Sequence, residues 1–139
     1  MYEYACKVER VVDGDTVDVV LDLGFNILHK CRVRLFGIDT PESRTRNLDE
    51  KARGKMAAAF LENAINSGKK IVIQTKLKDS RGKFGRVLGN IIVDGININQ
   101  LMIDNYHAAV YFGQSKEDIE AVHDANRTKL MELGLFKPV

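Results

Sequence analysis

The sequence lacks the features that would indicate a disulfide scaffold, a zinc protein or a membrane-spanning protein. It has only two cysteines in 139 residues, and no spacing of cysteine and histidine is typical of a zinc site. No apolar run reaches the roughly 18 residues that a membrane-spanning helix needs. Both cysteines, Cys6 and Cys31, fall in strand-like runs. We therefore expect two buried free thiols and no bridge between them.

A large excess of charge of one sign is also absent. The net charge is +2 and the isoelectric point is near 8.5, whereas a protein that coats DNA is usually more basic. The distribution is more informative than the total, because basic residues gather in residues 29–55 and 69–86 and acidic residues gather nearer the ends. A partner that carries phosphate would therefore meet the middle of the chain.

What is present is the composition of an ordinary soluble globule, with 45% hydrophobic and 29% charged residues. A chain of this length fits one domain, and we expect residues 1–139 to form it. No signal peptide is visible, because the strand pattern begins a few residues after Met1. We therefore expect a cytoplasmic protein, although the mature form of a secreted protein that had gained a new Met would look the same.

Hydrophobic periodicity predicts strands in the first third of the chain and a mixture of helices and strands after it. The predicted strands are residues 4–10, 17–22, 29–38, 71–75 and 86–93. The predicted helices run from about Ala52 to Gly68, from 97 to 105, and onward from Ser115, and a loop is expected at 43–49. These elements favour a mainly β protein with α-helices (α+β), built as a five-stranded Greek-key barrel of the OB type with about three helices.

Three carboxylates lie at turns or at strand ends. Asp15 leaves an Asp-Gly-Asp turn, while Asp39 and Glu42 lie on either side of the stop at Pro41. Each alone has an ordinary structural explanation, since aspartate caps turns and proline ends strands. If all three converge at one rim of a small barrel, they repel one another unless a cation lies among them. Oxygen ligands of this kind suit calcium or magnesium.

Two arginines could complete such a site. Arg34 lies five residues before Asp39 in a strand that is otherwise rich in apolar residues, and Arg86 follows a basic loop at 78–85. A guanidinium group can bind two phosphate oxygens and oppose the negative charge that grows in a transition state. A strand arginine is more often a solvated surface residue, so this interpretation depends on the neighbouring carboxylates. Together these residues predict a metal-dependent site for phosphate chemistry.

The ordered set of motifs resembles the staphylococcal nuclease family. The matching runs are residues 12–16, 34–42 and 83–86, with Asp94, Gly95 and Asn99 in register, and the likeness covers roughly residues 4–136. The resemblance implies an OB-type barrel that uses Ca²⁺ to hydrolyse phosphodiester bonds of DNA and RNA, leaving 3′-phosphates. We expect a monomer that favours single strands and has no membrane partner.

The resemblance also implies a role for each residue of the motifs. Asp15 and Asp39 match the calcium carboxylates, and Thr40 matches the residue that contributes its backbone carbonyl. Glu42 matches the general base that acts on the attacking water. Arg34 matches an arginine that holds the phosphate and stabilises the pentacoordinate transition state.

Arg86 matches the second arginine of the family, but the substrate-binding residues depart from its pattern. Phe84 stands where the family often has tyrosine, so a stacking face remains while a hydroxyl contact to phosphate is lost. Lys83 can still meet a phosphate. Tyr111 is the residue expected to stack on a base, and the second tyrosine of the family is absent.

Two other functions remain open at this point. A non-catalytic OB-type nucleic-acid-binding module would account for the altered aromatics, and a protein-interaction module is a further use of this family. The complete set of acids and arginines favours the nuclease, because a binding module has no need of a base beside a metal. His29, His107 and His123 join no motif and are expected to have structural roles.

Overall fold

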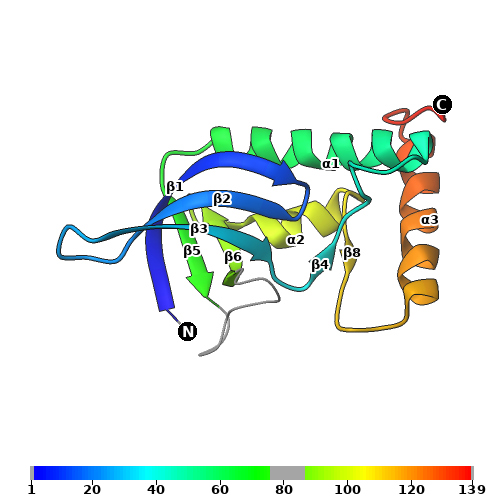
Figure 1. The fold of residues 1–139 in the computed structure, drawn as a ribbon. Helices are drawn as coiled ribbons and strands as arrows, with labels where there is room; N and C mark the ends of the chain where they lie inside the picture. The colour runs from blue at the N-terminus through cyan, green and yellow to red at the C-terminus, as the bar shows by residue number, and fades with distance from the viewer. Residues whose placement is uncertain (1, 76–86, 139) are drawn as a thin grey trace.

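The computed structural model describes residues 2–75 and 87–138. Its closed barrel consists of β1 (Tyr2–Asp13), β2 (Thr16–Asp22), β3 (Leu28–Leu35), β5 (Ile71–Thr75) and β6 (Val87–Val93). Neighbouring strands are antiparallel in the order β3-β2-β1-β5-β6, and a parallel pairing of β3 with β6 closes the barrel. The helices are α1 (Leu48–Asn66), α2 (Ile98–Asp104) and α3 (Lys116–Glu132) (Figure 1). The predicted OB-type α+β fold is confirmed.

The core fills the barrel and the space beneath α1. Alternate residues of β2 point inward, so that Val17 and Val19 are at most 1% exposed while the residues between them reach the outer face. Val33 of β3 and Ile73 of β5 are completely buried, and Leu61 of α1 belongs to the same core cluster. This alternation is the period of two from which the strands were predicted.

Each helix begins at a residue whose side chain accepts a hydrogen bond from the first turn. Asn47 accepts from the N–H of Glu50 at 3.0 Å, and Asn97 accepts from the first turn of α2. Ser115 accepts from the N–H of Asp118 at 3.1 Å, as its spacing predicted. Helix α1 starts at Leu48, so the predicted loop at 43–49 is two residues too long.

The predicted third strand, 29–38, is wrong at its end. Strand β3 stops at Leu35, and a turn at 36–37 redirects the chain. Gly37 has φ +79, which favours glycine because a side chain would be strained there. Asp39 therefore belongs to a separate two-stranded sheet, in which β4 (Ile38–Asp39) pairs with β8 (Ala109–Val110). Strands of two residues, including β7 (Ile96–Asn97), carry no periodic signal in the sequence.

The two cysteines are free thiols and are partly buried. Burial, followed by the nearby Cys31, raises the pKa of Cys6 to about 12, so its thiol stays protonated at neutral pH. No helix in the described residues combines the length and the apolar character that a membrane crossing requires.

His107 lies in the core, as its expected structural role requires. It is 6% exposed, and its ring centroid lies 4.6 Å from that of Phe60. Its Nδ1 is buried without a hydrogen-bond partner in the described part of the chain. Burial lowers the pKa of this imidazole below its ordinary value, because the interior does not solvate the charged ring.

The buried imidazole makes folding stability depend on pH. The unfolded chain binds the proton more readily, so the contribution of His107 to stability is fully present above the ordinary histidine pKa of about 6.5 and is lost as pH falls below it. We expect His107→Leu to flatten the fall in the free energy of unfolding between about pH 7 and about pH 5. Urea denaturation at several pH values across this range measures the slope of the unfolding free energy against pH. His29→Leu, at an exposed position, should keep the wild-type slope, and equal slopes for all three proteins would contradict the assignment.

Candidate active site

Asp15 and Asp39 meet around Arg34 at one rim of the barrel. Arg34 pairs with Thr16, the residue after Asp15, in the β2–β3 register. Its Nη2 lies 3.4 Å from Asp15 Oδ2 and 3.6 Å from Asp39 Oδ1, and its Nη1 donates to the carbonyl of Leu35 at 3.0 Å. The arginine side chain is only 16% exposed. One guanidinium group therefore lies between two carboxylates in a partly desolvated place.

Asp15 is held by threonines on both sides. Its Oδ2 accepts from the N–H of Thr40 at 3.3 Å and from the Thr40 hydroxyl at 3.0 Å, and its Oδ1 accepts from the Thr16 hydroxyl at 2.9 Å. The glycine of the Asp-Gly-Asp turn allows this close packing, because a Cβ at Gly14 would lie 2.8 Å from Ala57 of α1. These contacts fix the Asp15 carboxylate against the segment that carries Asp39.

Helix α1 supports the backbone of Glu42. The N–H of Glu42 donates to Glu50 Oε2 at 3.2 Å. A Cβ at Gly54 would lie 2.5 Å from the carbonyl group of Glu42, so the helix packs directly against this backbone. The Glu42 residue itself is exposed. Its carboxylate is therefore free to meet solvent while its main chain is held.

His123 is a site residue that the sequence analysis missed. Its Nε2 lies 2.8 Å from Asp39 Oδ2, and the side chain is 13% exposed. The sequence analysis placed this histidine in no motif, but α3 brings it against Asp39 across 84 residues of sequence. No local signal identifies it, since a histidine on a helix has many ordinary uses.

Helix α3 is anchored to α1 about one turn after His123. Arg127 lies four residues after His123 and donates to Asp49 of α1 through Nε at 3.0 Å and Nη2 at 3.0 Å, and Arg53 donates to the same carboxylate at 2.9 Å. The hydrogen bond from Arg127, together with that from Arg53, lowers the pKa of Asp49. Because residues four apart share one helix face, α3 contacts both Asp39 and the first turn of α1.

Asn99 fixes the turn that separates Arg34 from Asp39. Its side chain is 3% exposed and makes four hydrogen bonds. It accepts from the N–H of Ile91 at 3.1 Å and donates to the carbonyls of Phe36 at 2.9 Å and Gly89 at 3.2 Å. Its fourth bond goes to the side chain of Asn90, also on β6. The start of α2, strand β6 and the turn after β3 are thus joined through one amide.

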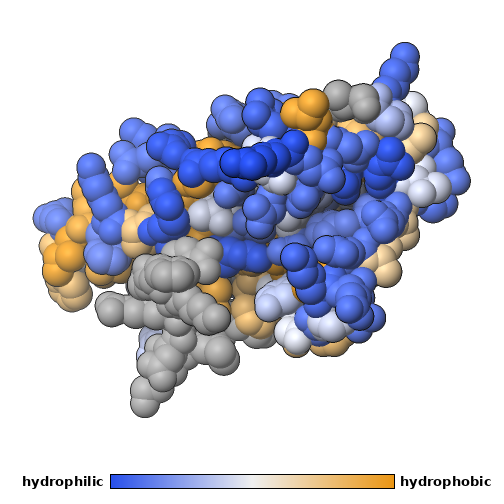
Figure 2. Space-filling model, turned by 45° about the vertical axis from the view of Figure 1, so that its right-hand side comes forward, coloured by the Kyte–Doolittle hydropathy of each residue, from blue (hydrophilic) through white to orange (hydrophobic). Residues whose placement is uncertain are grey.

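The cluster opens into two hollows of the surface. A cavity of about 330 Å³ is lined by Asp15, Arg34 and Asp39, and a groove of about 1080 Å³ begins at Arg34 and Asp39 and extends toward α3. Glu42 lines both hollows. The surface on the α3 side of the molecule is mainly hydrophilic (Figure 2). A reacting group at Arg34 could therefore be reached from either side.

The groove also holds the aromatic residue that was predicted to stack on a base. Tyr111 is 43% exposed and lines the groove, and its N–H donates to the carbonyl of Gly37 at 2.7 Å. Phe112, which was not predicted, lies beside it and is 79% exposed. Exposed aromatic rings in a groove are suited to stacking on nucleobases. The other predicted binding residues, Lys83 and Phe84, lie outside the described residues, as does Arg86.

The oxygens of the cluster fit a hard cation. Between residues 2 and 75 and between 87 and 138, no three His, Cys, Asp or Glu side chains by themselves form a metal-holding group. Calcium, however, also takes backbone carbonyls and water as ligands. Asp15 and Asp39 already share the positive charge of Arg34, and Thr40 is hydrogen-bonded to Asp15. Two carboxylates and a neighbouring carbonyl are the oxygen donors that such an ion prefers.

Comparison with known proteins agrees with this chemistry. The family model described as staphylococcal nuclease homologue matches residues 32–135, which is most of the chain. The chain belongs to the staphylococcal nuclease homologue family. In this nuclease-family chain the match contains Arg34, Asp39 and Glu42, whereas Asp15 precedes the matched range.

Several relatives of this family member are named as endonucleases. Endonuclease YhcR of Bacillus subtilis (strain 168) is 32% identical over 116 residues, which cover 79% of this chain and 9% of YhcR. Endonuclease YncB of the same organism is 30% identical over 104 residues, 75% of this chain and 46% of YncB. An uncharacterized endonuclease of Escherichia coli is 30% identical over 131 residues, 94% of this chain and 75% of that protein. The chain thus spans less than half the length of the two Bacillus relatives.

Asn99 should be a major determinant of stability in this fold. Asn99→Ala leaves the buried N–H of Ile91 without its partner, and we expect the free energy of unfolding to fall by about 2–3 kcal/mol. Urea denaturation measures the change. The matched control is Gln100→Ala, whose exposed side chain bonds Asp104 and whose loss should cost at most about 0.5 kcal/mol. Similar small losses in both variants would show that the Asn99 network contributes little.

Proposed function

We propose that this protein is a calcium-dependent nuclease that hydrolyses phosphodiester bonds of DNA and RNA and leaves 3′-phosphates. The observation that carries the proposal is the Asp15–Arg34–Asp39 cluster, whose cavity Glu42 also lines. Membership of the staphylococcal nuclease homologue family supports the same conclusion. The family match concerns the residues of the sequence, and the side-chain cluster concerns how the fold places them.

Arg34 supplies a fixed positive charge to the scissile phosphate. Its guanidinium is largely desolvated and is oriented by its bond to the Leu35 carbonyl. A preorganised charge of this kind opposes the negative charge that develops on the phosphate oxygens, and it needs no reorganisation during the reaction. Arg86 would add a second guanidinium, and Lys83 and Phe84 would contact the substrate. These three roles rest on the sequence motif.

Asp15, Asp39 and the backbone carbonyl of Thr40 would hold the calcium ion. When bound there, the ion supplies positive charge that polarises the phosphate and its attacking water. The two aspartates are oriented for this task by Thr40 and His123. Their orientation matters because a ligand set that is already in position loses less entropy when the ion binds.

Glu42 would accept a proton from the attacking water. General base catalysis requires a carboxylate within reach of the reacting group. Glu42 lines the same cavity as Arg34, and Glu50 holds its main chain. Tyr111 would stack on a base next to the scissile bond, which favours single strands because their bases are accessible.

Replacement of Glu42 tests the reaction directly. We expect wild-type protein to degrade single-stranded DNA with calcium and to stop when EGTA is added. Glu42→Gln should lower the rate by about 10²- to 10⁴-fold while the unfolding free energy changes by at most about 0.5 kcal/mol. Gel analysis of labelled oligonucleotides measures both products and rate. Glu62→Gln, an exposed substitution on α1, should cleave normally, and an inactive wild-type protein with calcium would rule out the proposed function.

His123 should act as a positioning residue for Asp39. Without the imidazole, the Asp39 carboxylate loses a partner at 2.8 Å, so we expect His123→Ala to weaken calcium binding about tenfold, as other lost partners of ligating groups do. Isothermal titration calorimetry measures the affinity without any need for catalysis. His123→Gln, which can still donate to the carboxylate, should restore much of the affinity.

The control for this experiment is Val122→Ala, the exposed neighbour on the same helix, which should bind calcium as the wild type does. A tenfold loss in His123→Gln as well as in His123→Ala would mean that the hydrogen bond is not the feature that matters. Unchanged affinity in His123→Ala would remove its positioning role.

A further inference from the structure

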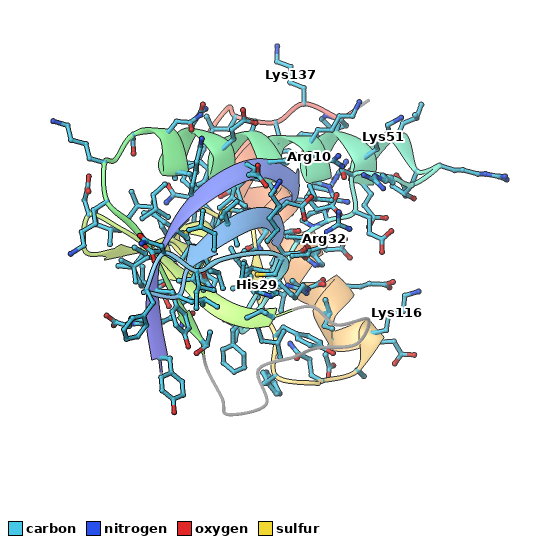
Figure 3. All side chains as sticks on the ribbon, turned by 60° about the vertical axis from the view of Figure 1, so that its left-hand side comes forward. Arg10, His29, Arg32, Lys51, Lys116 and Lys137 are labelled. Atoms are coloured by element: carbon cyan, nitrogen blue, oxygen red, sulfur yellow. The ribbon has the colours of Figure 1, made fainter. Side chains whose placement is uncertain are left out.

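The outer face of strands β1, β2 and β3 carries two rows of charged residues beside the site. Directly paired residues of neighbouring antiparallel strands share one face. The pairing of the strands gives one row of Lys7, Val20 and Lys30, and a second row of Arg10, Asp18 and Arg32. We name the four cations, Lys7, Arg10, Lys30 and Arg32, the basic strip. All four are exposed, and Figure 3 shows Arg10 and Arg32 over these strands.

The basic strip leads away from Arg34. Lys30 and Arg32 alternate along β3 with inward-facing residues, so they share the face of Arg34. Alternate residues of a strand lie about 6.6 Å apart, which puts Lys30 about 13 Å from Arg34 along the strand. Arg32 also interacts electrostatically with Asp13, and Asp13 lines the cavity that contains Arg34. The strip therefore begins at the edge of the cavity.

The basic strip keeps an excess of positive charge. Arg32 donates to both oxygens of Asp18, at 2.8 and 3.2 Å. This contact, with a smaller contribution from Arg10, lowers the pKa of Asp18. One carboxylate thus faces four cations in these two rows. In the part of the chain that the structure describes, Lys7 and Lys30 make no ion pair, so both remain available to an external anion.

We propose that the basic strip binds successive phosphates of the substrate strand on one side of the scissile bond. The idea rests on the proposed nuclease function. Arg34 and Asp39 line both the cavity and the groove, so a strand that passes them enters the groove with Tyr111 on one side and meets the basic strip on the other. A row of cations on a strand face suits a nucleic acid backbone, because its charges repeat at regular intervals and release counterions when they are neutralised.

The strip makes binding depend on the length of the strand. The rise of about 3.4 Å per nucleotide holds for a strand of duplex DNA, and an extended single strand is longer per nucleotide, so at most roughly four nucleotides separate a phosphate at Arg34 from one at Lys30. A dinucleotide, which has a single phosphodiester, cannot contact Arg34 and Lys30 together. A longer strand gains contacts that contribute affinity without contacting the reacting phosphate.

The experiment measures binding without cleavage. Glu42→Gln protein in EGTA is titrated into fluorescently labelled oligothymidylate of about 20 nucleotides and into a labelled dinucleotide, with anisotropy as the readout. Adding Lys7→Gln and Lys30→Gln should weaken binding of the long strand about tenfold at roughly 0.15 M salt, and should lower the slope of log affinity against log salt by about 1.4. Binding of the dinucleotide should not change.

The control is Lys129→Gln with Lys137→Gln, which removes the same charge from exposed positions of α3 and the C-terminal segment. Figure 3 shows Lys137 well apart from the strands that carry the strip. An equal loss of affinity in the control, or an equal loss for the dinucleotide, would overturn the proposal. If wild-type protein binds long strands through the strip but never cleaves them, the nuclease function is contradicted and the role of the strip is supported. If the protein cleaves DNA but Lys7→Gln and Lys30→Gln do not weaken its binding of long strands, the role of the strip is contradicted and the nuclease function is supported.

Discussion

Closure of the barrel through the buried amide of Asn99 is the interaction on which the site depends. The parallel pairing of β3 with β6 closes the barrel, and beside it the N–H of Phe36 donates to the carbonyl of Gly89 at 2.9 Å. Asn99 bonds to the same turn and to β6 at the same time. A fully satisfied polar network in the interior favours one arrangement, because any other leaves a donor or acceptor unpaired. The separation of Arg34 from Asp39 is set by this turn, so the geometry of the cluster follows from the closure.

The cluster combines two negatively charged carboxylates with one positively charged guanidinium group. Asp15 and Asp39 repel each other, and Arg34 lies between them and attracts both. Helix α3 adds His123 on the far side of Asp39 and is itself fixed to α1 by the pair of Arg127 and Asp49. Because α1 also supports Glu42, the two helices and the barrel orient the site from three directions. Such orientation by neighbouring groups is what preorganises a charged site for phosphate chemistry.

Much of the fold and part of the site could be predicted from local patterns. The alternation of buried and exposed residues identified the five barrel strands, and the cap at Ser115 marked the start of α3. The carboxylates at the ends of strands were expected to converge, and Asp15 and Asp39 do lie around Arg34. The failures are also physical. The end of β3 was placed three residues too late, because the apolar pattern continues through a turn that Gly37 permits.

By itself, the sequence determined the period of each strand, the caps of the helices and the types of residue available for phosphate chemistry. These properties depend on neighbours within a few positions, so the order of residues is enough to specify them. Only the tertiary structure decided that His123 reaches Asp39, that α3 is joined to the start of α1, and that Lys7 and Arg10 of β1 share rows with Lys30 and Arg32 of β3. Such contacts depend on how separate elements pack, and no local periodicity records which residue of a helix meets a strand 84 residues away.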